Sequence, residues 1–331
     1  MNKFVKIDKK RFNSLMEKFR KIQQDFLKEF EVDDIFSNSK IYEIIIANSL
    51  NHNLIPGHSG SKDAKNDKGK IFEYKHYKET SSNHTWTFND YSEQTIKDLK
   101  DCTVIFAHID DTVFPAIFDW YYEVEGKNIS AFMTKATKKI KNTRKMINIS
   151  RNNIEDVMKV ERTDVKPKKT GKYSKWLGNI AEINTELESC TNVINLLTSN
   201  KIWEVLIAVE LNHNVNSEQG GRAGAHDAFD SKENLFEYKV SKTFSWNFQD
   251  ISDNVLNKYK SDNEIILAVV DKTEIKVKAI YSAKPEIVVK LLRKKLREKK
   301  KKFEEEGKEL RRLQVSITKG DLEKINATKI M

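Results

Sequence analysis

The chain has few of the residues that define specialised protein classes. Its 331 residues include only two cysteines, Cys102 and Cys190, with four prolines and eleven glycines. Two cysteines this far apart provide neither a disulfide framework nor the paired ligands of a zinc site. So little glycine and proline excludes a collagen-like chain. The 38% of hydrophobic and 10% of aromatic residues are enough to build folded cores, which excludes wholesale disorder.

Long hydrophobic runs are also missing. The longest, at 41–47 and 265–270, are much shorter than the roughly 18 residues that a membrane helix needs. The first ten residues carry lysines with no apolar stretch behind them, which is not the pattern of a secretory signal. From the sequence we therefore expect a cytoplasmic protein with no membrane partner.

The charge balance is positive. Lys and Arg number 59 against 49 Asp and Glu, a formal net charge of +10. Such an excess favours a polyanionic partner, although it also serves solubility alone. Because no membrane-binding amphipathic segment accompanies the charge, nucleic acid is the first partner to consider.

The sequence contains an internal repeat. Four segments recur in the same order at offsets of 160 to 164 residues: SNSKIYE (37–43) as TSNKIWE (198–204), LNHN (50–53) at 211–214, FEYK (72–75) at 236–239, and WTFND (86–90) as WNFQD (246–250). Further downstream, 146–157 is echoed by 313–325. Offsets that drift by a few residues are typical of loop insertions in a duplicated domain.

The repeat predicts two tandem domains of similar fold. We expect the first at 1–160 and the second at 173–331, joined by a polar linker at 161–172 that contains Pro167 and Gly171. In each repeat an amphipathic helix is followed by a second apolar helix, a glycine-bearing loop, short strands and a lysine-rich helix. Helices flanking a mixed central sheet make each domain α/β.

One constellation of charged residues is common to both repeats. Glu73 and Lys75, like Glu237 and Lys239, stand two residues apart in a strand-like segment, so their side chains point to one face. An aspartate precedes each glutamate by ten residues, Asp63 in the first repeat and Asp227 in the second.

Two carboxylates and an amine at one place suit metal-assisted hydrolysis of a phosphodiester. Mg²⁺ prefers a few carboxylate oxygens and leaves positions for water and a substrate phosphate. It lowers the pKa of bound water, and a lysine can hold that water or stabilise charge on the phosphate. The alternative is an ordinary Glu–Lys ion pair on a solvated strand.

The constellation resembles that of the PD-(D/E)XK nuclease superfamily, and the chain is similar in size to type II restriction endonucleases. The resemblance implies that Asp63 and Glu73, and likewise Asp227 and Glu237, bind a divalent metal, while Lys75 and Lys239 assist the nucleophile. Many members add a glutamate from an early helix to the metal site, and Glu43 and Glu204 occupy that place. The proline of the family motif is absent, since Lys62 and His226 stand before the aspartates.

The resemblance implies a Mg²⁺-dependent endonuclease that cuts double-stranded DNA to 5′-phosphate and 3′-hydroxyl ends. Each half would cut one strand, so that one chain acts as a monomeric pseudo-dimer. A DNA methyltransferase is expected as a partner by analogy with restriction systems. Four alternatives stay open: one catalytic half with a DNA-binding effector half, a repair nuclease that acts on junctions or nicks, a non-catalytic DNA-binding repeat protein, and an RNA-processing enzyme.

Other repeated residues are given simpler interpretations. His52 and His213 are expected to fix a loop rather than act as bases, and Trp86 and Trp246 to pack in the core rather than stack on nucleotide bases. Asp90 and Asp250 are expected to cap helices. The segments 58–62 and 220–222 could approach DNA, and the basic helix at 293–312 could contact phosphates or simply be a solvated face.

Overall fold

A computed structural model describes most of the chain: residues 7–32, 35, 40–56, 62–140, 145–166, 170–194, 196–197, 201–215, 226–307 and 313–331. Pro167, the segment 58–61 and the glycine-bearing segment 220–222 lie outside these residues. Contacts divide the chain into two units. The N-terminal unit is Lys21–Glu182, and the C-terminal unit is Met1–Arg20 together with Ile183–Met331.

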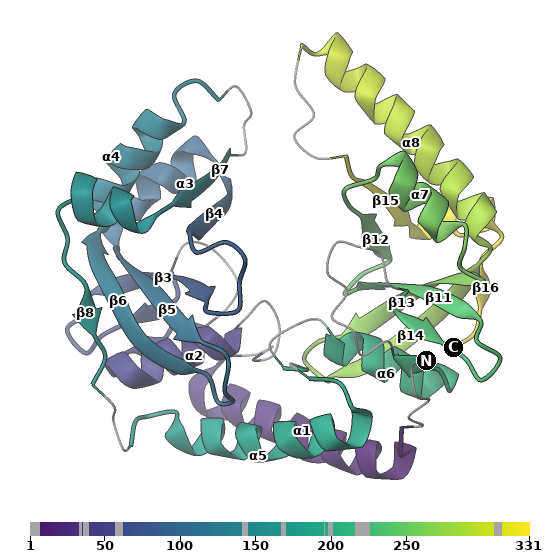
Figure 1. Cartoon of the computed structure of the whole chain (residues 1–331), viewed down its shortest axis with the longest axis horizontal. Helices are drawn as coiled ribbons and strands as arrows, with labels where there is room; N and C mark the ends of the chain where they lie inside the picture. Colours follow the sequence, from purple (N-terminus) through teal and green to yellow (C-terminus); the bar gives the residue numbers. More distant parts are fainter. Residues whose placement is uncertain are drawn as a thin grey trace. The chain divides into compact units, whose positions relative to one another are not determined.

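Two long helices each contribute to both units (Figure 1). Helix α1 (Lys9–Phe30) is divided at residue 20, and α5 (Ser174–Thr191) at residue 182. In α1 the buried side chains recur every three or four residues, which is the stripe of an amphipathic helix: Phe12, Leu15, Met16, Phe19, Ile22 and Phe26. The contact division therefore differs from a boundary drawn at the end of the repeat. No described helix is long and apolar enough to cross a membrane.

The N-terminal unit is built on a mixed six-stranded sheet. The strands run in the order β1 (Asn53–Leu54), β2 (Ala64–Lys65), β3 (Ile71–Lys78), β5 (Thr103–Asp110), β6 (Ile117–Glu125) and β8 (Thr163–Asp164). Strands β3 and β5 are parallel, and the other neighbours are antiparallel. Strand β8 lies in the segment expected to be a linker and pairs with β6 at the sheet edge.

The sheet of the C-terminal unit has the same strand order. It contains β9 (Asn214–Val215), β10 (Ala228–Phe229), β11 (Leu235–Ser241), β13 (Glu264–Asp271), β14 (Lys276–Ala283) and β16 (Thr328–Lys329). Here too the only parallel pair among these strands joins the third to the fourth, β11 to β13. The expected fold class, two tandem α/β domains with mixed sheets, agrees with this topology.

A two-stranded antiparallel ribbon accompanies each sheet. In the N-terminal unit β4 (Trp86–Tyr91) pairs with β7 (Lys145–Ile149), and in the C-terminal unit β12 (Ser245–Phe248) pairs with β15 (Val315–Thr318). The late echo between 146–157 and 313–325 thus corresponds to equivalent strands. Shorter turns follow: η2 (Asn153–Val157), η3 (Lys319–Asp321) and η4 (Glu323–Ile325).

The remaining helices also match between the units. The N-terminal unit contains α2 (Lys40–Leu50), α3 (Glu93–Asp98), the turn η1 (Leu99–Asp101) and α4 (Gly126–Ala136). The C-terminal unit contains α6 (Lys201–Leu211), α7 (Asp253–Tyr259) and α8 (Pro285–Glu305). The expected aspartate caps are wrong. Ser92 and Ser252 cap α3 and α7 by accepting backbone N–H bonds. Asp90, in an irregular part of β4, and Asp250, after β12, have positive φ angles instead.

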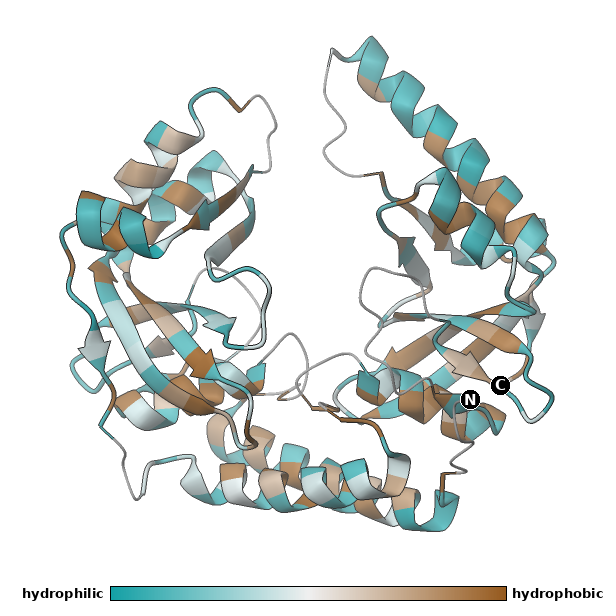
Figure 2. Cartoon of the chain, in the orientation of Figure 1, coloured by the Kyte–Doolittle hydropathy of each residue, from teal (hydrophilic) through white to brown (hydrophobic). Residues whose placement is uncertain are grey.

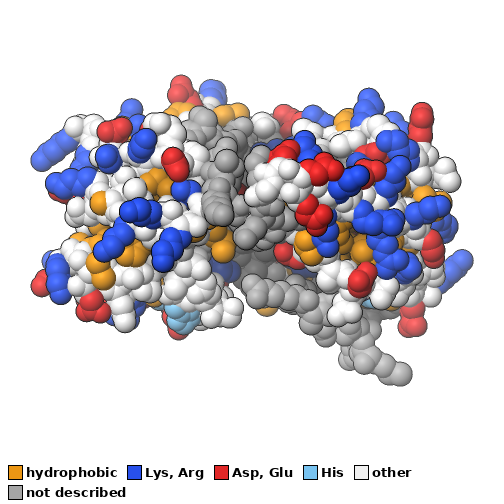
Figure 3. Space-filling model, turned by 90° about the horizontal axis from the view of Figure 1, so that it is seen from above, with side chains coloured by type: hydrophobic (Ala, Val, Ile, Leu, Met, Phe, Trp, Pro, Cys, Tyr) orange, Lys and Arg blue, Asp and Glu red, His pale blue; other side chains and the backbone are white. Residues whose placement is uncertain are grey.

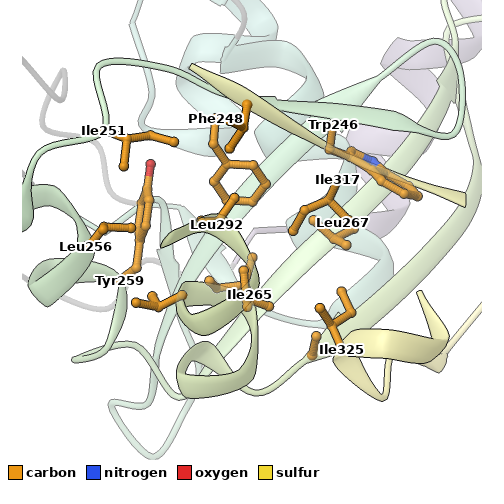
Figure 4. Close-up of a cluster of buried hydrophobic side chains, with 14 of the residues drawn as sticks. Trp246, Phe248, Ile251, Leu256, Tyr259, Ile265, Leu267, Leu292, Ile317 and Ile325 are labelled. Carbon is orange, nitrogen blue, oxygen red and sulfur yellow. The ribbon is translucent and has the colours of Figure 1, made fainter. Parts of the chain in front are cut away.

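Alternating side chains of β13 show how one sheet builds two cores. Ile265 and Leu267 point to a cluster that includes Trp246, Phe248 and Leu292, drawn in Figure 4, while Ile266 and Ala268 pack on the α6 side. Figure 2 shows the resulting hydrophobic colouring of the strands of both sheets. Trp86 and Trp246 are fully buried and donate their indole N–H to Ala107 and Ala268 carbonyls. Their expected core role is confirmed.

Candidate active site

A short hairpin brings Asp63 next to Glu73 in the N-terminal unit. Ala64 of β2 lies opposite Phe72 of β3, so Asp63 precedes the pairing and its backbone N–H donates to the Phe72 carbonyl at 2.9 Å. One carboxylate oxygen of Asp63 accepts the backbone N–H of Tyr74 at 2.6 Å. The ten-residue spacing of the sequence therefore spans β2, the turn at 66–70 and the start of β3.

Glu73 and Lys75 form a buried ion pair on the ribbon side of β3. Glu73 is 3% exposed, and its Oε1 lies 2.5 Å from the Lys75 ammonium and 3.0 Å from the Tyr91 hydroxyl. The ammonium also lies 5.2 Å from the centre of the Phe88 ring. Its burial would lower the pKa of Lys75, but the charges of Glu73, Tyr91 and Asp63 outweigh burial and raise it above the ordinary value. Lys75 is therefore a firmly charged ammonium.

The other oxygen of Glu73 has no partner. Among the described residues Oε2 is buried without a hydrogen bond, an arrangement that is costly for a carboxylate. Burial raises the pKa of Glu73, Asp63 acts in the same direction, and Lys75 opposes them. A carboxylate that is buried, half-satisfied and close to a second acid is a typical ligand for a cation.

Glu43 adds a third acid from helix α2. It pairs with Lys40 one turn earlier, and the side chains of both are largely buried. Burial, and then the charge of Asp63, raise the pKa of Glu43 to about 7, against the opposing effect of Lys40 and Lys75. The charge of Asp63 thus acts on both Glu43 and Glu73.

The C-terminal unit repeats this arrangement. Asp227 donates its backbone N–H to the Phe236 carbonyl at 3.1 Å and accepts that of Tyr238 at 2.8 Å. Glu237, 6% exposed, pairs with Lys239. Burial, and then the charge of Glu237, raise the pKa of Asp227. The expected residues of each repeat are thus brought together by the same strand pair.

Helix α6 supplies Glu204 to this second cluster. The carboxylate lies 2.5 Å from the ammonium of Lys201, the counterpart of Lys40. Burial and the charge of Asp227 raise the pKa of Glu204 to about 7. The two helix lysines were not predicted, although they stand in the repeated segments 37–43 and 198–204 at a helical spacing from each glutamate.

A tyrosine ring lies beside Lys75 and another beside Lys239, but the two tyrosines occupy different positions in the two repeats. The Tyr91 ring, at the end of β4, is centred 5.8 Å from the Lys75 ammonium, and the Tyr259 ring, at the end of α7, is centred 5.3 Å from that of Lys239. At an offset of 160 Tyr91 corresponds to Ile251, and Tyr259 corresponds to Leu99. Sequence comparison of the repeats misses both tyrosines because neither is matched by a tyrosine.

The repeated histidines are structural. His52 and His213 each bond through Nδ1 to the hydroxyl of a tyrosine on the central strand, Tyr74 or Tyr238, at 2.8 Å. Each ring also stacks on the preceding phenylalanine of that strand. These contacts lie on the face opposite the lysines, which confirms the expected loop-fixing role. In the C-terminal unit His226 additionally pairs with the buried Asp262.

The types of donor at this site, carboxylates from a helix and a hairpin, are those of a hard divalent cation. As placed, no three His, Cys, Asp or Glu side chains in the described ranges converge closely enough to hold an ion. The reason is local: Glu43 and Glu73 face lysines, and Asp63 binds a backbone amide. The unsatisfied oxygen of Glu73 favours a cation here, and carboxylate oxygens are the donors that Mg²⁺ prefers.

His76, which follows Lys75, makes the stability of the N-terminal unit sensitive to acid. Burial, then Lys75 and Lys78, lower its pKa to about 4. Because the unfolded histidine has a pKa near 6.5, stability is retained above that value and is lost as pH falls toward 4. The second repeat has Val240 at this place. We expect His76→Val to remove about 2 kcal/mol of the stability loss between pH 7.5 and pH 5, as measured by urea unfolding.

The exposed His84 provides the control for this measurement. His84→Val should leave the pH dependence of the urea midpoint unchanged. An equal loss of stability with acid in wild type and His76→Val would mean that folding does not lower the pKa of His76.

An α/β unit in which a strand hairpin joins Asp, Glu and Lys beside a helix-borne glutamate is the arrangement of a PD-(D/E)XK-like nuclease. Residues 7–163 match the family model described as Restriction endonuclease PvuII. Over this segment the chain matches a family of type II restriction endonucleases and has their PD-(D/E)XK-like fold. The match covers the first repeat and does not extend into the second. No curated protein matches the chain.

The family match supports a general activity for the chain, that of a type II restriction nuclease. A nuclease of this class binds double-stranded DNA. Restriction endonucleases of this family generally use divalent metals. The rival interpretation as a non-catalytic DNA-binding repeat protein loses its support.

Proposed function

We propose that the chain is a site-specific endonuclease in which each unit hydrolyses one strand of duplex DNA. The observation that carries this proposal is the duplication of the whole site: the same hairpin places Asp63, Glu73 and Lys75 in one unit and their counterparts in the other. Two strand-specific sites on one chain do the work of a homodimer, so the protein acts as a monomeric pseudo-dimer in the cytoplasm.

The metal ligands of the proposed sites are the acids of each cluster. Asp63, Glu73 and Glu43 hold Mg²⁺ in the N-terminal unit; Asp227, Glu237 and Glu204 hold it in the C-terminal unit. When bound, Mg²⁺ lowers the pKa of a coordinated water and offsets negative charge on the phosphate. Burial and a neighbouring aspartate raise the pKa values of Glu43 and Glu204 to about 7, and a bound cation would stabilise the charged form of both carboxylates.

Lys75 and Lys239 act on the attacking water and the phosphate. Each ammonium is buried against a glutamate and an aromatic ring, which fixes its position. Its raised pKa keeps it protonated, so it donates hydrogen bonds to the water and to the phosphate oxygens as negative charge develops. Attack on phosphorus with departure of the 3′ oxygen leaves 5′-phosphate and 3′-hydroxyl ends.

The proposal predicts metal-dependent cleavage of duplex DNA. Supercoiled plasmids from several unmethylated sources, incubated with the protein and Mg²⁺, should give discrete linear fragments, and EDTA should abolish all cutting. Structured RNA under the same conditions should stay intact. Cleavage that persists in EDTA, or fragments from RNA but not DNA, would contradict the proposal. Protection by a methyltransferase from the same system would identify the expected partner.

A further inference from the structure

Helix α8 continues well beyond the core of the C-terminal unit. Its last side chain in the hydrophobic cluster is Leu296, and no residue from Arg297 to Glu305 is buried. Helix α4, which follows the equivalent strand in the N-terminal unit, has 11 residues, whereas α8 has 21. The additional turns of α8 therefore do not contribute to the core that both units share.

This extension is strongly basic. Eight Lys or Arg residues and one acid occur between Arg293 and Lys302, including four consecutive lysines at 299–302. The distal half of α8 is largely hydrophilic in Figure 2, and Lys and Arg side chains are dense on this side of the C-terminal unit in Figure 3. A run of like charges repels itself unless counter-charges lie nearby.

Counter-charges on the helix itself neutralise the run poorly. The pairs Lys301–Glu305 and Lys302–Glu306 have N···O distances of 3.9 Å, with both lysine side chains more than 70% exposed. Exposed pairs of this kind contribute little. Within the described residues no carboxylate pairs with Lys300, whose side chain faces solvent.

The root of the extension is fixed beside a polar groove. Lys295 binds Asp321 and the Ser316 carbonyl, and Lys299 binds the Gln314 carbonyl at 2.8 Å. These bonds tie α8 to β15 and line a cavity of about 470 Å³, which Asn247 and Glu298 also border. The helix is therefore held in place where its exposed lysines begin.

We propose that the α8 extension, Arg297 to Lys302, binds the phosphate backbone of duplex DNA outside the cleavage site. A helix held in place and bearing an arginine and four lysines within two turns presents several cations to phosphate oxygens, and these contacts do not depend on base sequence. A membrane surface is a poor fit, because Phe303 is the only apolar side chain from Arg297 to Glu305. The proposal rests on the proposed function, since it presumes a DNA substrate.

The test is the salt dependence of DNA binding by a variant of the extension. Lys300→Gln, Lys301→Gln and Lys302→Gln are combined in the full chain, because glutamine preserves helix propensity. Binding to a 30-base-pair duplex is followed by fluorescence anisotropy in EDTA. The slope of log K against log salt should become shallower by about 2 to 3, which corresponds to roughly 100- to 1,000-fold weaker binding at 0.1 M salt and less than about tenfold at 0.5 M.

A matched control removes the same charge elsewhere in the unit. Lys276, Lys278 and Lys284 are exposed and paired with acids, so their combined change to Gln should leave the slope nearly unchanged. Circular dichroism verifies that both variants keep the helix. Normal plasmid cleavage by wild type with equal slopes in both variants overturns the α8 proposal and spares the proposed function. If the wild type does not cleave plasmid but the slope becomes shallower only in the α8 variant, the proposed function is overturned and the α8 proposal stands. If the α8 variant lost more affinity for single-stranded RNA than for duplex DNA, the choice of duplex DNA as the partner would be wrong.

Discussion

Changing Lys75 to alanine is expected to convert a double-strand cutter into a nicking enzyme. The variant loses the ammonium that donates to water and phosphate in the N-terminal unit, so cutting of one strand should slow by about 10³-fold. The other unit keeps Lys239 and should cut its strand at the wild-type rate. Supercoiled plasmid should therefore stop at open circles, and Lys239→Ala should give the same result for the opposite strand. The double variant should cut neither strand.

Lys127 offers a control with the same sequence spacing. It follows Glu125 by two residues and pairs with it at 2.6 Å, but its side chain is 68% exposed and no aspartate stands ten residues before the glutamate. Lys127→Ala should linearise plasmid like wild type. Strand assignment comes from sequencing the nicked circles of each variant. If Lys75→Ala abolishes all cutting while Lys239→Ala cuts normally, the C-terminal unit is an effector domain instead.

The sequence predicts that these residues lie near one another because they are close in the chain. Asp63 and Glu73 lie on one hairpin, and Lys75 is two residues further along the same strand, so period-2 alternation and a short turn are enough to bring them together. Duplication then distinguishes these residues from other Glu-x-Lys pairs such as Glu125 and Lys127. Glu43 comes from a separate helix, and its position followed from resemblance to a family rather than from spacing.

Features that depend on long-range packing were not predictable. Helices α1 and α5 are each divided between the units, although the repeat pattern runs through both without a break. Side chains such as Phe26 and Tyr173, from different repeats, pack together with ring centres 5.8 Å apart, and nothing in a single helix periodicity indicates such a partner. Strand β8 escaped prediction because two exposed residues carry no hydrophobic alternation.

The tyrosines and the helix caps show two further kinds of failure. Tyr91 and Tyr259 reach their lysines from unrelated positions, so a comparison that seeks identical residues at identical offsets discards both. Ser92 and Ser252 were better cap candidates than the aspartates two residues earlier. Ser92 stands three residues before Thr95, with which it forms a reciprocal capping box.

Asp63→Asn is expected to change stability in opposite directions with and without metal. The charge of Asp63 raises the pKa of both Glu43 and Glu73, which means that the three acids repel one another. Asparagine removes that charge and its carbonyl oxygen can still accept the Tyr74 N–H. In EDTA near pH 8 the variant should therefore be more stable than wild type by about 1 kcal/mol. Differential scanning calorimetry of the free protein measures this gain.

The same substitution should abolish the response to Mg²⁺. Mg²⁺ at about ten times its Kd stabilises a protein by roughly 1.4 kcal/mol, and the N-terminal unit of the variant should lose this increment together with strand cleavage. Asp67→Asn is the matched control: it removes the same charge four residues away, from an exposed carboxylate that accepts the Asn53 amide at 3.1 Å. It should keep the wild-type response. Destabilisation of the metal-free protein by Asp63→Asn would contradict this prediction. It would mean that the lysines already offset the charges of the acids, and that these residues form structural ion pairs rather than a cation site.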